Sequence, residues 1–158
     1  MDKFLTYLKE QEWKIAFSEK GENCLPQEIE KRYAKILQSW REFISGIRSI
    51  ENADDTTWFL CEDDFKIRRE HSFQWNEWEI ISLNSAENDV QWEAEIKEFW
   101  NHHFPIILSV KNGYYYYAIS MENGSVVYGA EPEFEVCETV APSFEEFLRK
   151  IIKGEILI

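Results

Sequence analysis

The sequence has few glycines, few cysteines and no long apolar run, and each scarcity excludes a class of protein. Its 158 residues include six glycines, none in a G-x-G spacing, so no glycine-rich phosphate-binding loop is present. The three cysteines, Cys24, Cys61 and Cys137, form no C-x-x-C pair and no metal-ligand spacing, so we expect reduced thiols. No apolar run approaches the roughly 20 residues of a membrane-spanning helix, and no signal-peptide pattern opens the chain. These absences favour a cytoplasmic protein without membrane contact or cofactor.

Basic residues are also scarce. The chain has 17 lysines and arginines against 30 acidic residues, a net charge of −13. Residues 51–100 alone have a net charge of −10, because 14 acidic residues there face only four basic ones. An acidic surface repels phosphates, so direct binding of nucleic acid is not expected. The same surface would attract a basic protein and accelerate their encounter, although the charge could also serve only solubility.

Aromatic residues, in contrast, are abundant: they make up 16% of the chain, with seven Trp, seven Tyr and eleven Phe. A single domain of this length buries about 70% of the surface of its unfolded chain, so no disulfide or metal is needed to hold it together. Most of the rings are therefore expected in the core. Tyr and Trp also anchor binding surfaces, so some rings could serve a partner.

The C-terminal part of the chain has the clearest local signals. Asn112-Gly113 and Asn123-Gly124 each lie between apolar runs, the strongest short-range signal for a β-hairpin. They predict antiparallel strands at about 105–110, 114–120 and 125–128, with a fourth strand at about 135–140. Alternation along the four consecutive tyrosines at 114–117 would place two of them on each face of the sheet. Ser143 then begins a helix, with Glu146 completing a capping box.

Helices are predicted to precede this meander. Apolar spacing predicts a short helix from about 3 to 17, with a possible break near Gln11. A turn at 21–23 and one long helix from 26 to about 49 are predicted to follow. A turn at 52–55 and a strand at 57–60 follow. A further helix ends before Pro105 and has four apolar residues on one face: Trp92, Ile96, Phe99 and Trp100. Helices, then a meander, then a helix indicate an α+β fold: a single domain, 1–158, in which an antiparallel β-sheet packs against several helices.

Clusters of carboxylates are the main candidates for chemistry. One comprises Asp54 and Asp55, and another comprises Glu62, Asp63 and Asp64. In the third, Glu131, Glu133 and Glu135 would project to one side of an extended chain while Phe134 enters the core. Such groups can act as acid or base catalysts, bind a hard cation, pair with arginines of a partner, or protect a sheet edge from aggregation.

Catalytic and metal sites are otherwise unsupported. His102 and His103 would point to opposite faces of a strand, and zinc would need two more ligands. No nucleophile elbow of the G-x-S-x-G type occurs. We therefore assign no catalytic residue, no metal and no cofactor from the sequence.

Several segments, in this order, resemble the SUKH superfamily, which includes the bacterial Syd protein and a yeast regulator of cell-wall synthesis. The resemblance covers residues 25–152 and is strongest over 99–152. Its residues are Leu25-Pro26, Trp58-Phe59-Leu60, Phe104-Pro105-Ile106, Tyr116-Tyr117-Ala118-Ile119, Gly124 with Val126-Val127, and Val140-Ala141-Pro142-Ser143-Phe144 leading into Phe147-Leu148.

The resemblance implies an α+β fold without enzymatic activity. Many bacterial members are immunity proteins that neutralise a cognate toxin, often a nuclease, of a polymorphic or contact-dependent system. The first hypothesis is therefore an immunity protein that binds a toxin with a basic surface. A scaffold or regulatory protein like the yeast member is the alternative, a small enzyme or metal binder is a third class, and a homodimer stays open. The candidate partner-binding residues are Asp54, Asp55, Trp58, Glu62, Asp63, Asp64, Trp75, Glu131, Glu133 and Glu135.

Overall fold

A computed structural model describes residues 2–18, 25–34, 36–66 and 73–158. The turn expected at 21–23 lies outside these ranges. Within them, the chain forms a seven-stranded antiparallel sheet whose strands neighbour one another in chain order. The strands are β1 (Lys14–Phe17), β2 (Ile47–Glu51), β3 (Thr57–Phe59), β4 (His103–Ser109), β5 (Tyr115–Ser120), β6 (Val126–Ala130) and β7 (Cys137–Ala141). The helices are α1 (Asp2–Glu10), α2 (Gln27–Arg32), α3 (Gln38–Ile44), α4 (Glu62–Lys66), α5 (Glu77–Ser85), α6 (Val90–His102) and α7 (Phe144–Ile152). The predicted α+β class is confirmed.

Strands β4 to β7 agree with the predicted meander. Asn112 and Gly113 both have positive φ, 58° and 115°, in the turn between β4 and β5. Gly124 has a φ of 75° in the turn between β5 and β6. Ser143 caps α7 by accepting a hydrogen bond from the Glu146 backbone N–H, at 3.2 Å. The short-range signals in this half of the chain were therefore sufficient to predict its elements.

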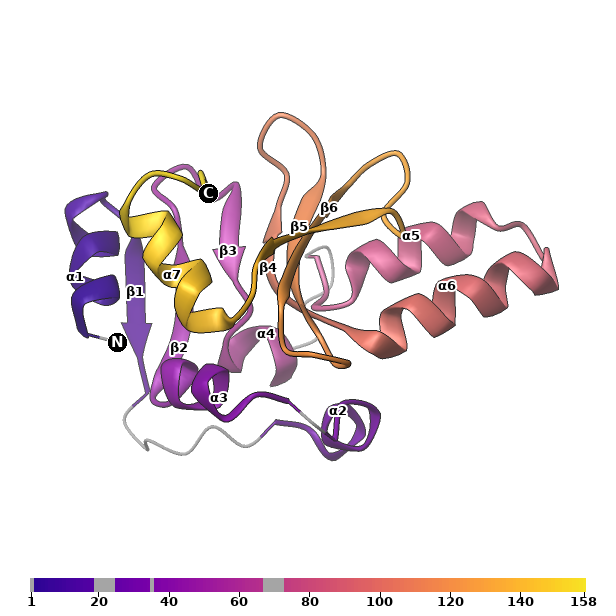
Figure 1. Cartoon of the computed structure of the whole chain (residues 1–158), viewed down its shortest axis with the longest axis horizontal. Coiled ribbons are helices and arrows are strands. Elements are labelled where there is room, and N and C mark those ends of the chain that lie inside the picture. Colours follow the sequence, from indigo (N-terminus) through magenta and orange to yellow (C-terminus); the bar gives the residue numbers. More distant parts are fainter. Residues whose placement is uncertain (1, 19–24, 35, 67–72) are drawn as a thin grey trace.

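The two faces of the sheet are covered by different helices. Cross-strand partners Phe59, Ile107 and Tyr117 lie in one row, and the Tyr117 ring packs 4.9 Å from Phe147 of α7. In the neighbouring row, which faces the other way, Tyr116 packs 4.9 Å from Trp100 of α6. Two tyrosines of the 114–117 run thus lie on each face, as the alternation predicts. Figure 1 shows α1 and α7 at one end of the molecule, and the antiparallel α5–α6 hairpin (residues 77–102) extending away from the sheet at the other.

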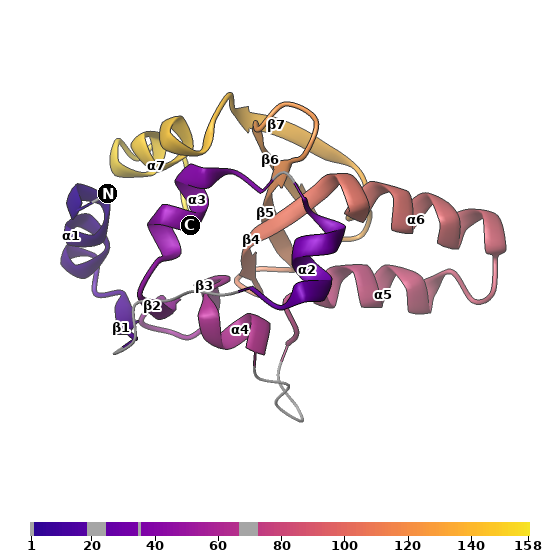
Figure 2. The same ribbon diagram turned by 90° about the horizontal axis from the view of Figure 1, so that it is seen from below.

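The predicted long helix from 26 to 49 is wrong. The chain instead forms α2, then α3, then strand β2. Gly46 has a φ of 74°, a left-handed conformation just after α3 that ends the helix. Ile47 and Ile50 then point into the core from β2, where Ile50 pairs with Ile15 and Phe59. Apolar residues recur every three or four positions across all three elements because the buried side chains of each belong to the same core. Figure 2 shows the course of the chain through these elements.

The predicted helix from 3 to 17 breaks near Gln11, as the sequence allowed, but the rest of the segment is a strand rather than helix. The helix ends at Glu10, and Glu12 takes a left-handed φ of 62° that redirects the chain into β1. Trp13, Ile15 and Phe17 alternate along this segment, which is the period of a strand. Phe17 is largely exposed at the edge of the sheet.

Candidate partner-binding surfaces

The α5–α6 hairpin concentrates the negative charge of the protein. Its residues 77–102 include seven carboxylates and a single lysine, a net charge of −6 with neutral histidines. Asp89 caps α6 by accepting hydrogen bonds from the backbone N–H groups of Gln91 and Trp92, each at 3.1 Å. The cap fixes the start of α6, and with it the side of the hairpin on which Trp92 lies.

A groove separates this hairpin from the loop between β6 and β7 (residues 131–136). Its volume is about 320 Å³, and Trp92, Glu133, Glu135 and Val136 contribute to its walls. Trp92 is 44% exposed and Val136 is 66% exposed, so two apolar side chains are open to solvent beside carboxylates. The expectation that Trp92 lies on the buried face of its helix is wrong, because only Ile96 and Trp100 of α6 are buried. Together, the hairpin and this loop form a surface that we call the acidic groove.

The three glutamates of the loop do not share one face. Residues 131–135 form turns rather than an extended strand, so the alternation expected for Glu131, Glu133 and Glu135 does not apply. Glu131 lies beside Gly113 of the neighbouring turn, whereas Glu133 and Glu135 line the groove. Phe134 is buried, as expected, and stacks on Trp78 of α5 at 5.5 Å.

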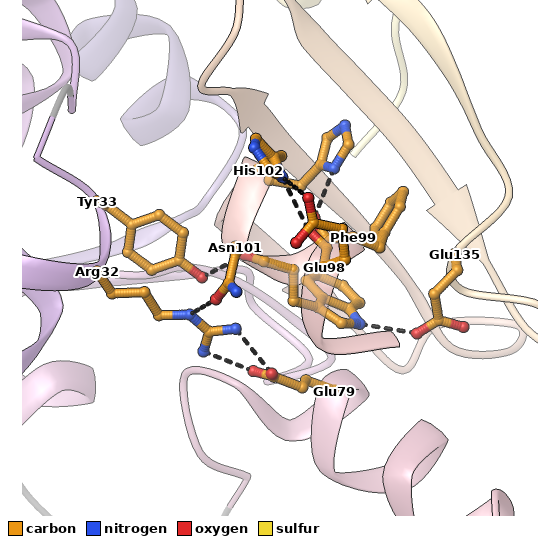
Figure 3. A network of polar contacts seen from close by, with 10 residues as sticks. Arg32, Tyr33, Glu79, Glu98, Phe99, Asn101, His102 and Glu135 are labelled. Carbon is orange, nitrogen blue, oxygen red and sulfur yellow. Dashed lines mark hydrogen bonds and ion pairs between the residues drawn. The ribbon is translucent and has the colours of Figure 1, made fainter. Parts of the chain in front are cut away.

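Glu135 also connects the loop to the hairpin. Its carboxylate accepts a hydrogen bond of 2.8 Å from the indole Nε1 of Trp100 in α6 (Figure 3). Trp78 donates its own indole Nε1 to the backbone oxygen of Tyr115 in β5, at 3.0 Å. Both indoles place a polar group at the boundary between core and surface. Trp100 thereby joins α6 to the loop, and Trp78 joins α5 to the sheet.

A polar network holds the hairpin against α2 on its other side. Arg32 donates two hydrogen bonds to the buried Glu79 carboxylate, at 2.7 and 2.8 Å, and a third to the Asn101 side chain at 2.8 Å. Tyr33 donates from its hydroxyl to the backbone oxygen of Trp100 at 2.7 Å (Figure 3). A bidentate guanidinium–carboxylate pair of this kind fixes the direction as well as the distance of its partners.

A second hollow brings together two of the predicted residues, Asp64 and Trp75. It has a volume of about 600 Å³ and lies between α2, α4 and the segment that leads into α5. Arg32, Phe65 and Glu28 are among its other lining residues. We call it the Asp64–Trp75 pocket. Its size is in the range of protein sites for small groups.

Asp64 is the carboxylate whose ionisation is most affected by its surroundings. Burial raises its pKa to about 7, and the nearby carboxylates of Glu51 and Asp63 act in the same direction. The backbone N–H of Cys61 donates to Asp64 at 2.8 Å and opposes this effect. At neutral pH, Asp64 is therefore divided between its neutral and charged forms, and a cation placed beside it would favour the charged form.

The other predicted residues lie on separate elements and are mostly paired within the protein. Asp54 and Asp55 are exposed in the β2–β3 turn, where Asp55 pairs with Lys14. In α4, Glu62 pairs with Lys66 and Asp63 pairs with Arg48. Trp58 of β3 is partly buried and stacks on Phe73 at 5.8 Å. The ten candidates therefore do not form one continuous site: two line the pocket, two line the groove, and six lie elsewhere.

Metal ligation has little support in the described part of the chain. No three His, Cys, Asp or Glu side chains there are grouped so that they could hold a metal ion. His102 ends α6, and its Nδ1 donates to the Glu98 backbone oxygen, while His103 Nδ1 donates to that of Phe99. Cys61 and Cys137 are free thiols, and Cys24 lies outside the described ranges.

Sequence reasoning missed the acidic groove. The acidic count of residues 51–100 was evident, but only the fold shows that half of those carboxylates belong to one projecting hairpin. The helix period assigned Trp92 to the core, and its exposure had no local signal.

Of the helices in the described ranges, none is long and apolar enough to cross a membrane. Comparison of the chain with protein-family models, curated proteins and solved structures finds no match.

Proposed function

We propose that this chain is a non-enzymatic interaction protein, and specifically an immunity protein that binds and neutralises a cognate toxin with a basic surface. The acidic groove is the surface that we assign to this partner. The observation that carries the proposal is the exposure of Trp92 beside Glu133 and Glu135, on a hairpin with a net charge of −6. Aromatic anchors surrounded by charge are typical of the centre of a protein–protein interface.

Charge supports a basic partner rather than a nucleic acid. Glu87, Glu95 and Glu98 project into solvent from the hairpin, and none of them pairs with a lysine or arginine among the described residues. A nuclease binds phosphates with a basic cleft, and an acidic projecting element can occupy such a cleft in place of the nucleic acid. The resemblance to the SUKH superfamily favours the same conclusion by analogy.

The test begins with capture of partners by the tagged protein from its native cells, at low and then moderate salt. Three proteins are compared: the wild type, a groove variant with Glu87→Lys, Glu95→Lys and Glu133→Lys, and a control with Glu10→Lys, Glu42→Lys and Glu155→Lys. The two variants change the net charge equally, and all six positions are exposed. We expect a basic partner that the wild type and the control retain, and that the groove variant loses.

The partner is then purified and its activity is measured with each of the three proteins. An immunity protein should suppress a toxic activity, most directly nuclease activity, and the groove variant should suppress it less. Equal binding by the groove variant and the wild type at low salt would remove the acidic groove from the proposal. Capture of several cell-wall or housekeeping proteins, without a toxin, would favour the scaffold or regulatory alternative.

Trp92 provides an independent test of the same surface. Trp92→Ala should weaken binding by about tenfold or more, because an interface anchor contributes at least about 1.4 kcal/mol. Phe17→Ala is the matched control, since Phe17 is similarly exposed but lies on β1, far from the hairpin in the chain (Figure 1). Equal losses from the two substitutions would indicate that Trp92 has no special role.

A further inference from the structure

The Asp64–Trp75 pocket is separate from the acidic groove and has a different composition. The groove is bordered by α5, α6 and the β6–β7 loop, whereas the pocket lies between α2, α4 and the start of α5. Carboxylates of Glu28 and Asp64 line it together with the rings of Phe65 and Trp75. Carboxylates beside aromatic faces make a favourable environment for an organic cation.

The rings of the pocket are held in place from behind. Phe65 packs 6.2 Å from Trp75 and stacks on Phe104 of β4 at 5.9 Å. Trp75 also contacts Tyr33, with their centroids 6.2 Å apart. The aromatic wall is therefore continuous with the core, and a guest would meet a preformed surface.

The protein already places one guanidinium on this wall. The Arg32 guanidinium carbon lies 6.0 Å from the centre of the Trp75 ring and 5.3 Å from that of Tyr33. Its charge is neutralised by the bidentate pair with Glu79, so it does not strongly oppose a second cation in the pocket. Trp75 thus has the geometry and the surroundings that guanidinium stacking requires.

The pocket also has acceptor groups in excess. Asp64 forms no ion pair with any described residue, and its carboxylate accepts a backbone hydrogen bond from Cys61. Two further oxygens on the bordering elements, Glu62 Oε2 in α4 and Asn76 Oδ1 before α5, are buried without a hydrogen-bond donor in the described ranges. Buried polar groups are normally satisfied. The described residues there also include one buried donor without an acceptor, Nε1 of Trp40, whose ring lies 6.1 Å from Phe65, so among them two unsatisfied oxygens stand against one N–H.

We propose that the Asp64–Trp75 pocket binds the guanidinium of an arginine side chain from the protein partner. The guanidinium would pair with Asp64, stack on the aromatic wall, and donate to the oxygens in excess around it. A planar cation with five N–H donors fits this combination better than the compact ammonium of lysine. The two cations that line the pocket, Arg32 and Lys66, already pair with Glu79 and Glu62. Glu28 and Asp64, in contrast, form no ion pair with a described residue, so the pocket favours a cation over an anion. The inference rests on the proposed function for the source of the arginine, but the pocket itself can be tested without the partner.

The probe is N-acetylarginine methylamide, titrated into the full chain while the indole N–H signals are followed by NMR. The Trp75 signal is identified by its loss in Trp75→Phe. We expect saturable shifts of that signal, and at least fivefold weaker binding by Asp64→Asn. Glu42→Gln, which removes the same charge from an exposed position of α3, should bind like the wild type.

Two comparison ligands make the test specific. The citrulline analogue has nearly the same shape without the charge, and the lysine analogue has the charge without the planar group. Weaker binding of both supports the proposal. Equal binding of the citrulline analogue, or unchanged binding by Asp64→Asn, overturns it. If the groove variant loses the partner but still binds the arginine probe, the two sites act separately. If the wild type binds the partner but not the arginine probe, the proposed function stands without this pocket.

The pH dependence provides a further readout. Charged groups around Asp64 are Glu51, Asp63 and Glu28, which favour its neutral form, and Arg32 and Lys66, which favour its charged form. Because the charged form is the one that binds a cation, affinity should be about tenfold higher near pH 8 than near pH 6. Asp64→Asn should show no such change. A pH-independent affinity of the wild type contradicts the role of Asp64.

Discussion

Tyr116 lies directly across Gly129 of the neighbouring strand, and its hydroxyl donates a 2.6 Å hydrogen bond to the backbone oxygen of Phe134. A Cβ atom at Gly129 would overlap the Tyr116 ring. The missing side chain therefore lets an aromatic residue on β5 reach the loop after β6. Since Phe134, Glu135 and Val136 belong to that loop, this contact also determines the shape of one wall of the acidic groove.

Gly129→Ala should accordingly lower the free energy of unfolding by about 1–3 kcal/mol, the usual cost of forcing extra volume into a packed site. Urea unfolding followed by circular dichroism measures it. In a Tyr116→Leu background the ring is absent, so the additional cost of Gly129→Ala should fall to near zero. An equal cost in both backgrounds would mean that strand propensity, and not the ring, is responsible.

The C-terminal half of the fold could be predicted because its signals are local. The first Asn-Gly turn has positive φ at both Asn112 and Gly113, and the second has it at Gly124, a conformation that few residues other than Asn and Gly adopt. Ser143 and Glu146 likewise identify a helix start within four residues. Such features depend on the chain itself and do not require knowledge of its packing partners.

The N-terminal half could not be predicted in the same way, because tertiary contacts decide its elements. Ile47 and Ile50 have the spacing of a helix, yet they pair within the sheet as part of β2. The residue that ends the helix is Gly46, but a single glycine among apolar residues is weak evidence for a helix end. Apolar spacing indicates which residues face the core, but it does not by itself identify the element that presents them.

The candidate sites show the same difference. Asp64 and Trp75 were identified separately, eleven positions apart, and the fold brings them together across one pocket. Trp92 was assigned to the core because its three partners on the predicted helix face, Ile96, Phe99 and Trp100, are all apolar. Its exposure results from the projection of the hairpin beyond the sheet (Figure 1), a property of the assembled fold.

Glu79→Gln should destabilise the protein by about 2–4 kcal/mol. Glu79 is nearly buried and receives two hydrogen bonds from Arg32, so its neutralisation leaves a partly buried guanidinium without its counter-charge. Glu93→Gln is the control, since Glu93 forms an exposed pair with Lys97 on α6 and should cost under about 0.5 kcal/mol. Thermal and urea unfolding of both variants measure the difference. Similar costs at the two positions would contradict the structural importance of the Arg32–Glu79 pair.

Asp89→Ala should lower stability by about 1 kcal/mol, because two backbone N–H groups at the start of α6 lose their acceptor. Asp89→Ser should retain most of that stability, since Ser is also a good N-cap. Urea unfolding and helical circular dichroism of the two variants provide the comparison. If Ser and Ala are equally destabilising, the aspartate contributes through its charge near the helix N-terminus rather than through capping.

Asp64→Asn should change how stability depends on pH, and the sign follows from the raised pKa. Between about pH 4 and pH 7 the folded protein retains a proton on Asp64 that the unfolded chain has released, so this group makes stability fall as pH rises through that window. Well above pH 7 both states are ionised and the loss is complete, on the order of 4 kcal/mol for a shift from 3.8 to about 7. The asparagine variant can still accept from the Cys61 N–H, but it has no charge to bury. It should therefore match the wild type near pH 5 and exceed it in stability near pH 8.

Other carboxylates titrate in the same range, so the informative quantity is the difference between the two urea unfolding curves at each pH. A constant difference would mean that Asp64 ionises in the folded protein as it does in the unfolded chain. A widening difference would show that the wild type retains, at a cost in stability, a carboxylate that an asparagine could replace, as expected of a group kept for binding.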